Sequence, residues 1–299
     1  MKRKGTGPDG LVIVDKPAGI TSHGVVARIR RLAGTRKVGH AGTLDPMATG
    51  VLVIGVEKAT RLLGHLMLTD KTYEATIRLG QTTVTDDAEG EPTATVSTDG
   101  VTPEAIAKGV TALTGDILQT PSKVSAIKVD GKRSYALVRE GAEVELKARP
   151  VTVATFTVHA QRAAVAEDGT PLIDLDVTVE CSSGTYIRAL ARDLGAGLGV
   201  GGHLTALRRT RVGPYTVQQA HTLEQLEESF GTLPLGAAAA AAFPRWDVDA
   251  DQARLLVNGV RLKSPGLAPG PVAVFGPEDR FLALVEEKHG QARPLAVFA

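Results

Sequence analysis

The sequence predicts a globular protein that contains both α-helices and β-strands. Hydrophobic residues fill 43% of the 299 positions and charged residues 22%, proportions that are typical of folded proteins. Two stretches, 71–79 and 172–181, alternate apolar and polar residues in the manner of half-buried strands. Two others, 22–33 and 185–194, place apolar residues at helical spacing. We therefore expect helices and sheet in one chain.

The first elements lie near the N-terminus. An apolar run at 11–14 predicts a short buried strand, and the turn residues at 15–19 end it. The helix that follows has Ser22 as its expected N-cap and stops at a glycine. Farther along the chain, the strand at 71–79 places Tyr73 on its apolar face.

The middle of the chain mixes loops with a helix. Polar, turn-rich sequence predicts a loop at 86–100. The next helix begins after Thr102 as cap, with a proline at its first position, and ends at Gly115. Residues 120–145 are basic and marked by glycines, which favours a hairpin or an extended loop.

A strand end and a helix start meet near residue 184. The strand at 172–181 has Cys181 on its inward face, and the helix at 185–194 begins directly after it. Tyr186 and Arg188 therefore lie at a junction between two elements. Functional groups are often held at such junctions.

The last part of the chain predicts a small β-rich domain over residues 246–299. Short apolar runs at 272–275 and 281–285 stand between Gly and Pro turns, as strands do. The alanine run at 237–242 precedes the domain as a helix or a spacer. Residues 1–245 form the larger domain.

The charge distribution suggests a nucleic-acid partner more strongly than the net charge of +1 does. Basic residues gather in 1–38, 128–133 and 208–211, while the acidic residues gather elsewhere. Such segregation gives a basic face, which is the electrostatic footprint of nucleic-acid binding. An ordinary solvated surface is the alternative.

The compartment predicted from the sequence is the cytoplasm. A single cysteine, Cys181, allows no disulfide framework. The basic N-terminus lacks the apolar stretch of a signal peptide, and no run approaches the ~20 apolar residues of a membrane span. We expect a protein that does not engage a membrane.

One carboxylate stands out in the segment His40–Leu52. Asp45 follows a Gly-Thr stretch and precedes Pro46, so it lies in a tight turn. A carboxylate held this way acts as a covalent nucleophile or a general base, or it closes the turn. Taken alone, the Asp-Pro pair favours a role for Asp45 in closing the turn over a catalytic role.

The other candidate groups predict no chemistry of their own. Cys181 is expected to be a buried, inert thiol, and no histidine has metal-ligand spacing, so we expect no metal. The glycine-rich run 197–202 follows a helix and not a strand, which excludes a dinucleotide loop. Asp86 and Asp87 are expected in a solvated loop.

Five segments resemble, in order, the motifs of the bacterial tRNA pseudouridine-55 synthases, the B-type family of pseudouridine synthases. They span about residues 10–217, and the resemblance weakens after about residue 245. The segments are Asp15–Ser22, His40–Leu52, Lys71–Ala75, Val124–Ala136 and Cys181–Arg188, the last continuing to His203–Thr210.

The resemblance implies an α+β fold. Residues 1–245 would form a pseudouridine synthase catalytic domain with a mixed, largely antiparallel sheet, and residues 120–145 would be a loop that grips RNA. Residues 246–299 would be a small β-rich domain similar in position to the family's PUA-like module.

The resemblance also assigns roles. The catalytic aspartate falls on Asp45, the motif tyrosine on Tyr73 and the motif arginine on Arg188. Further residues fall on substrate-binding positions: His40, Tyr186 and Leu207. The basic clusters supply candidate phosphate contacts: Lys16, Lys128, Arg133, Arg208 and Arg209.

The implied reaction converts uridine to pseudouridine in the T-loop of tRNA with no metal or organic cofactor. It breaks a C–N glycosidic bond and forms a C–C bond to the same sugar, so an ionised aspartate serves it. An arginine beside the aspartate favours the ionised form. The uridine lies inside a folded loop and must be flipped out.

Three readings of the function remain open. The first is a stand-alone, monomeric tRNA enzyme without an obligatory protein partner. The second is the catalytic subunit of an RNA-guided pseudouridylation complex, which shares this core. The third is a tRNA-folding chaperone. The motifs and the lack of long basic tails favour the stand-alone enzyme.

Overall fold

The computed structural model describes residues 8–122, 128–129, 132–133 and 146–298, with only the backbone described at 128–129 and 132–133. The chain divides into two compact units. The first holds residues up to 46, 50–68 and 212 onward, and the second holds 47–49 and 69–211. No helix of the described residues is long and apolar enough to cross a membrane.

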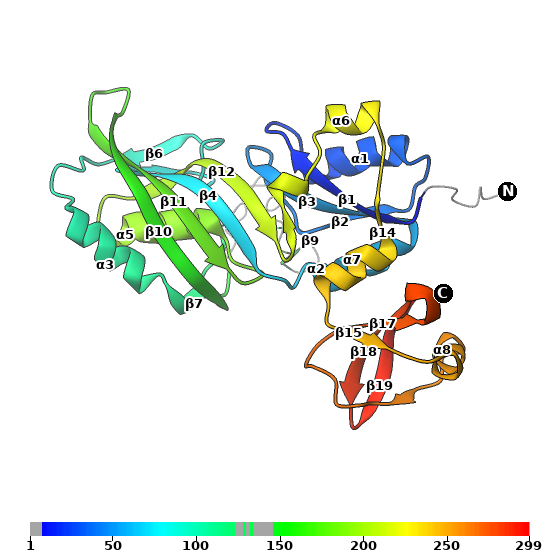
Figure 1. Cartoon of the computed structure of the whole chain (residues 1–299). Coiled ribbons are helices and arrows are strands. Elements are labelled where there is room, and N and C mark those ends of the chain that lie inside the picture. The colour runs from blue at the N-terminus through cyan, green and yellow to red at the C-terminus, as the bar shows by residue number, and fades with distance from the viewer. Residues whose placement is uncertain (1–7, 123–127, 130–131, 134–145, 299) are drawn as a thin grey trace. The chain divides into compact units, whose positions relative to one another are not determined.

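The first unit begins with an antiparallel sheet in the order β14-β1-β3, with β2 also paired to β3 (Figure 1). Its core is mostly aliphatic and includes Leu11, Val51 and Val53, together with aromatic residues such as Tyr215 and Phe243. The strands are β1 (Gly10–Lys16), β2 (Val38–Ala41), β3 (Thr49–Val56) and β14 (Leu233–Pro234). The helices are α1 (Ser22–Leu32), α2 (Leu63–Leu66), α6 (Leu223–Glu228) and α7 (Leu235–Ala242). Short elements complete it: η1 (Glu57–Arg61), β13 (Tyr215–Thr216) and η2 (Val217–Gln219).

Helix α1 forms where the sequence predicts it, but its cap lies one residue earlier. The hydroxyl of Thr21 accepts a hydrogen bond from the Gly24 amide at 3.0 Å, so Thr21 is the N-cap. Ser22 is instead the first helical residue and is buried. Its hydroxyl is therefore available for a contact outside the helix.

The second unit is built on strands in the order β12-β4-β11-β10-β7. Strand β11 pairs antiparallel with β4 and β10, and β10 pairs antiparallel with β7. The strands are β4 (Lys71–Leu79), β7 (Gly115–Gln119), β10 (Arg149–Val165), β11 (Pro171–Cys181) and β12 (Gly202–Val212). The two alternating stretches of the sequence are strands, as their pattern predicts, and the structure places them side by side. A small pair, β5 (Gln81–Thr83) and β6 (Pro92–Thr95), lies in the stretch between β4 and the next helix.

Two helices accompany this sheet. Helix α3 (Pro103–Ala112) begins at Thr102, whose hydroxyl accepts from the Ala105 amide at 3.2 Å, as the sequence predicts. Helix α5 (Ile187–Gly197) contacts α3 and β4, and α3 contacts β10 (Figure 1). Because α5 starts two residues after the expected position, Tyr186 becomes its N-cap and Arg188 its second residue.

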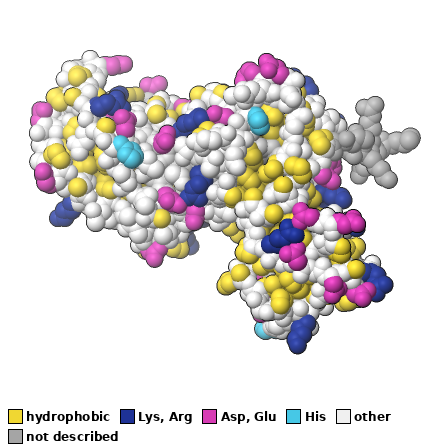
Figure 2. Space-filling view, viewed as in Figure 1, with side chains coloured by type: hydrophobic (Ala, Val, Ile, Leu, Met, Phe, Trp, Pro, Cys, Tyr) yellow, Lys and Arg dark blue, Asp and Glu magenta, His cyan; other side chains and the backbone are white. Residues whose placement is uncertain are grey.

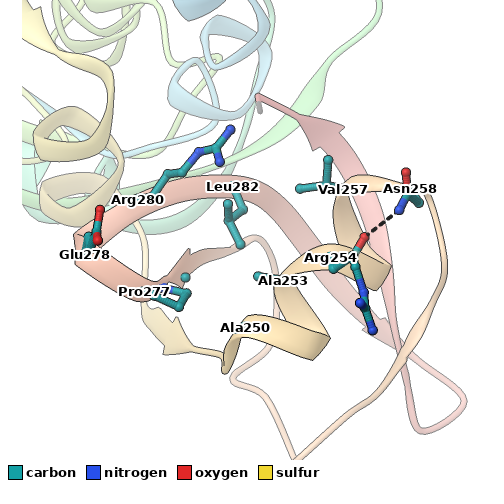
Figure 3. A pocket seen from close by; sticks show the side chains of 10 residues that line it. Ala250, Ala253, Arg254, Val257, Asn258, Pro277, Glu278, Arg280 and Leu282 are labelled. Atoms are coloured by element: carbon teal, nitrogen blue, oxygen red, sulfur yellow. Dashed lines mark hydrogen bonds between the residues drawn. The ribbon is translucent and has the colours of Figure 1, made fainter.

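The C-terminal segment is β-rich, as predicted. Its five-stranded sheet has the order β15-β17-β18-β19-β16. The strands are β15 (Arg245–Asp247), β16 (Leu262–Lys263), β17 (Val272–Gly276), β18 (Arg280–Lys288) and β19 (Gln291–Val297). Helix α8 (Ala250–Val257) and the short η3 (Pro277–Asp279) complete it. A cavity of about 400 Å³ lies between α8 and the start of β18, with Ala253 and Leu282 in its wall (Figure 3).

The alanine run is helical, and it joins the core of the first unit. Ala238 and Ala239 of α7 belong to one buried cluster with Leu63, Phe275 and Phe281. The β-rich segment is therefore packed into the first unit, and the expected domain boundary at residue 245 stays a prediction. The α+β class is confirmed.

Candidate active-site residues

Asp45 lies in the turn between β2 and β3, and this turn is held from α1. The buried hydroxyl of Ser22 accepts from the Leu44 amide at 2.9 Å and donates to the Leu44 carbonyl at 3.0 Å. Both polar groups of the residue before Asp45 are therefore satisfied by one side chain. The Asp45 side chain itself is half-buried. The arrangement fixes the backbone that carries the carboxylate.

Lys16 braces the same turn, which corrects its expected role as a phosphate contact. Its side chain is fully buried, and its ammonium donates to the carbonyls of Pro17, Ile20 and Pro46 at 2.9, 2.8 and 3.1 Å. The Gly19 amide also donates to the Pro46 carbonyl, at 2.9 Å. A phosphate contact needs an ammonium at the surface, whereas this one ties the end of β1 to the residue after Asp45.

His40 lies on β2, in the same unit as Asp45. Its half-buried ring packs edge-to-face on His23, with 5.4 Å between the ring centroids and 84° between the planes. Edge-to-face packing is one of the arrangements that aromatic rings prefer. Its expected role in taking the place of a flipped base stays a prediction.

Tyr73 lies on the inward face of β4, as its sequence pattern predicts. Its side chain is buried, and so are Ala75 and Ile77 at the following alternate positions. Across the strand pair its neighbour is Val179 of β11. The same face carries Lys71, which is also buried, so the strip holds two polar groups, the Tyr73 phenol and the Lys71 ammonium.

Arg188 is nearly fully buried and has an acidic partner that the sequence did not indicate. Its Nη1 donates to the Thr85 carbonyl at 2.8 Å and lies 3.3 Å from Oδ2 of Asp87. Asp87 is 2% exposed and also accepts from the Glu89 amide at 3.1 Å and from the Thr85 hydroxyl. The expected solvated aspartate is therefore wrong for Asp87, which anchors Arg188 inside the second unit.

Tyr186, the N-cap of α5, is held through its backbone. Its N–H donates to Oε1 of Gln119 at 2.8 Å, and its carbonyl accepts from Nε2 of Gln119 at 3.1 Å. Gln119 is another residue that the sequence pattern did not single out, because its partner lies 67 positions away. Its only sequence signal is a polar side chain at the end of a strand, just before the basic segment.

Three of the predicted substrate-binding residues lie on β12, and they differ in exposure. Leu207 is buried, in keeping with an apolar wall. Arg209 is 1% exposed, so it is a buried cation and not the surface phosphate contact that we expected. Arg208 is half-buried, and its Nη1 donates to the Thr49 hydroxyl at 3.2 Å. Its contact with RNA stays a prediction.

The remaining basic candidates fall where little is described. Lys128 and Arg133 are register partners in the antiparallel pair of β8 (Lys128–Val129) and β9 (Lys132–Arg133). Their side chains, and most of residues 123–145, lie outside the described residues. On the face shown in Figure 2, the Lys and Arg side chains of each unit are interspersed with Asp and Glu.

Burial shifts the pKa of several groups in the second unit. It lowers the pKa of Lys71 to about 8, and repulsion from Arg209 adds to the effect. Burial raises the pKa of the Cys181 thiol to about 11, which agrees with the expected inert cysteine. It also lowers the pKa of His203, whose Nδ1 lies 2.9 Å from the Gln81 carbonyl. Lys71 and Cys181 are register partners on β4 and β11.

Comparisons with known proteins agree with this fold. The family profile of the TruB family pseudouridylate synthase N-terminal domain matches residues 30–187. The profile of the tRNA pseudouridylate synthase B C-terminal domain matches 188–233, and that of the tRNA pseudouridine synthase II C-terminus matches 243–299. Four of the five motif segments therefore lie within matched regions, and the first, Asp15–Ser22, precedes them.

Curated relatives match over the full length. The tRNA pseudouridine synthase B of Streptomyces griseus subsp. griseus is 68% identical over 299 residues, which cover 100% of both chains. That of Thermobifida fusca is 62% identical over 291 residues, covering 97% of this chain and 99% of the relative.

Solved structures share the fold at lower identity. An H/ACA RNP bound to a substrate RNA containing 2′-deoxyuridine is 26% identical with a TM-score of 0.71, covering 97% of this chain and 85% of that one. A Cbf5-Nop10-Gar1 complex is 27% identical with a TM-score of 0.70, covering 97% and 84%.

The fold and the motif residues define the class, which is that of the pseudouridine synthases, a group of isomerases. Within this class, the chain belongs to the TruB family.

Proposed function

We propose that this protein converts a uridine in the T-loop of tRNA, at position 55, to pseudouridine, with Asp45 as the catalytic carboxylate. The observation that carries the proposal is the double bracing of the Asp45 turn by Ser22 and Lys16. A turn that only reverses the chain does not need a buried ammonium and a buried hydroxyl to fix its backbone. A reactive group does, because catalysis depends on its placement.

The substrate is proposed from the relatives. Those with 56–68% identity are named tRNA pseudouridine synthase B, and the first two share their whole length with this chain. The solved guided complexes, by contrast, share 26% and 27% identity. We therefore propose the stand-alone tRNA enzyme over the guided subunit. We also propose that the protein is a cytoplasmic monomer, and that it needs no protein partner, metal or organic cofactor.

The proposed chemistry uses three side chains. Asp45 attacks C1′ of the ribose or C6 of the base, or stabilises a cation at C1′, while the N1–C1′ bond breaks. The C5–C1′ bond then forms, the C5 proton leaves, and N1 gains a proton. Any bond formed to Asp45 breaks again with the carboxylate as leaving group, so the reaction is an isomerisation. Arg188 favours the ionised carboxylate of Asp45. Tyr73 stacks on the flipped base and moves a proton through its hydroxyl.

The remaining predicted residues support the flipped uridine. His40 fills the gap that the uridine leaves in the loop, Tyr186 contacts the base, and Leu207 supplies an apolar wall. Lys128, Arg133 and Arg208 contact RNA phosphates. Lys16 and Arg209 are not part of this proposal, because both are buried.

The test is incubation with an unmodified T-arm stem-loop, followed by mapping of pseudouridine. The expected product lies at the T-loop uridine, and Asp45→Asn abolishes it while the variant stays folded and binds RNA. Absence of product from the wild-type protein, or product at another uridine, overturns the assignment. If the protein is a chaperone, the Asp45→Asn variant still folds tRNA. If it is only an enzyme, the variant shows no tRNA-folding activity.

A further inference from the structure

A single buried side chain holds both peptide groups of Tyr186. Oε1 of Gln119 accepts from the Tyr186 N–H at 2.8 Å, and Nε2 of Gln119 donates to the Tyr186 carbonyl at 3.1 Å. Gln119 is the last residue of β7 and is 2% exposed. A carboxamide carries both a donor and an acceptor, so it makes the same pair of bonds as a neighbouring strand.

The residue held in this way starts helix α5. Tyr186 has extended backbone angles, φ −105° and ψ 109°, and its own side chain makes no capping hydrogen bond. Its carbonyl also accepts the helical hydrogen bond of the Leu190 amide, at 3.2 Å. The carbonyl that begins α5 is therefore the same one that Gln119 holds. A shift of Gln119 would move the origin of the helix.

Further contacts attach the first two turns of α5 to the rest of the second unit. Arg188 donates to the Thr85 carbonyl at 2.8 Å. Arg192, one turn later, donates to the Thr120 carbonyl at 2.7 Å, next to Gln119 in the chain. The start of α5 is thus fixed on one side by residues 119–120 and on the other by the loop at Thr85.

We infer that Gln119 is a positioning residue for the isomerisation: it fixes the backbone of Tyr186 and, through the first turn of α5, the place of Arg188. The inference rests on the proposed function, which assigns Tyr186 and Arg188 to the site. Gln119 bonds to the backbone of Tyr186, so it acts through that residue and through Arg188. Its loss changes where they lie and leaves their chemistry intact.

The inference requires a group that both donates and accepts. Leucine is apolar and does neither. Glutamate accepts from the Tyr186 N–H but donates to the carbonyl only when it is protonated. Burial raises the pKa of a carboxyl group, so a glutamate at position 119 would gain its proton within a range that an enzyme assay covers.

The first experiment compares Gln119→Leu with the matched control Gln81→Leu. Gln81 lies in the same unit, and its Nε2 donates to the Thr95 hydroxyl at 3.3 Å. For Gln119→Leu we expect kcat per folded molecule to fall about 10- to 100-fold, as misplaced groups do, with the Kd for tRNA unchanged. Gln81→Leu keeps wild-type kcat. A wild-type kcat in Gln119→Leu, or a loss explained wholly by the unfolded fraction, overturns the inference.

The second experiment follows Gln119→Glu with pH. The ratio of its kcat to the wild-type kcat is expected to rise as pH falls from about 8 to about 5.5, because protonation restores the donor. The same ratio for Gln119→Leu stays flat, since leucine has no proton to gain. Flat ratios for both variants overturn the inference, because a residue with a purely structural role predicts no pH-dependent rescue.

Two readouts keep this inference separate from the proposed function. Release of tritium from C5-labelled uridine counts every isomerised uridine in the tRNA, whatever its position. Mapping of the product reports the T-loop uridine alone. Product at another position overturns the proposed target, while the kcat ratios from tritium release still support or overturn the role of Gln119.

Discussion

The Nη1 atom of Arg188 lies 3.3 Å from Oδ2 of Asp87, and the two side chains are 6% and 3% exposed. Removing one partner of such a pair leaves an uncompensated buried charge, which is costly. Arg188 gains a fixed position from the contact, because its Nη1 also bonds to the Thr85 carbonyl. We therefore expect a strong effect from substitution of Asp87, although this residue lies outside the motif segments.

Asp87→Asn is expected to lower both stability and turnover. Breaking a buried ion pair costs about 3–5 kcal/mol of unfolding free energy, and the displaced Arg188 should reduce kcat by roughly 10²-fold. Urea unfolding and single-turnover rates measure the two effects. The control is Asp86→Asn, whose carboxylate lies 3.4 Å from Arg192 and is 17% exposed. Equal losses in the two variants would contradict a special role for Asp87.

Tyr73→Phe should separate binding from catalysis. The ring keeps its place on the inward face of β4, so the Kd for tRNA should stay within about twofold while kcat falls by roughly 10²-fold or more, typical of losing a proton-transfer group. Tyr73→Leu serves as the comparison, because it also loses base stacking of ~1–3 kcal/mol. Near-wild-type turnover in Tyr73→Phe would remove the hydroxyl from the mechanism.

Lys16→Met should lower activity without changing the salt dependence of tRNA binding. The carbonyls of Pro17 and Ile20 lose the ammonium donor, at a cost of about 1–3 kcal/mol each if they stay dry, while the Pro46 carbonyl keeps the Gly19 amide, and the turn that carries Asp45 loosens. If Lys16 contacted a phosphate, its loss would instead make the fall of log K with log salt less steep, by about 0.7–0.9. We expect that reduced slope for Arg208→Gln. A reduced slope for Lys16→Met would return Lys16 to the RNA surface.

Stability should rise with pH above about 8 because of Lys71. Its pKa is lowered from 10.5 to about 8 in the folded protein, so between these values the unfolded chain binds the additional proton. Raising the pH through this window therefore favours the folded state, by up to about 3 kcal/mol. Urea unfolding at several pH values measures the slope, and Lys71→Met should remove this contribution.

Cys181 opposes this trend at higher pH. Its pKa is raised from 9.0 to about 11, so between these values the folded protein holds the additional proton and stability falls as pH rises. The two contributions should nearly cancel above about pH 9, and Cys181→Ala should extend the rise toward pH 10.5. A stability that falls between pH 8 and 9 in the wild type, but not in Lys71→Met, would contradict the assignment to Lys71.

The sequence was sufficient where one segment decides its own structure. The strand at 71–79 appears with the predicted bounds, and Thr102 caps its helix as expected, because alternation and caps depend on neighbouring residues. The family resemblance identified Asp45, Tyr73 and Arg188 through motifs of the same local kind. Their joint action stays a proposal.

The sequence was insufficient where a charge is buried by distant partners. Lys16 and Arg209 were expected on the surface, and Asp87 in a solvated loop, because charged residues usually lie there. Their burial depends on partners that pack only in the fold: Lys16 donates to a carbonyl 30 positions away, and Asp87 meets Arg188 from another element. Gln119 escaped notice for the same reason.

The pairing of Gln119 with Tyr186 also bears on the order of folding. Helix α5 is 11 residues long, and the side chain of its N-cap, Tyr186, makes no capping hydrogen bond, so α5 is marginal as an isolated helix. The group that completes its start belongs to β7, which leaves the ribosome 67 residues earlier. The helix that carries Arg188 can therefore form directly on a strand that has already been synthesised, so that the site is assembled in the direction of translation. A circular permutant that begins after Gln119 would reverse this order, and its yield of folded protein during synthesis, compared with that of the wild type, would show how much the native order contributes.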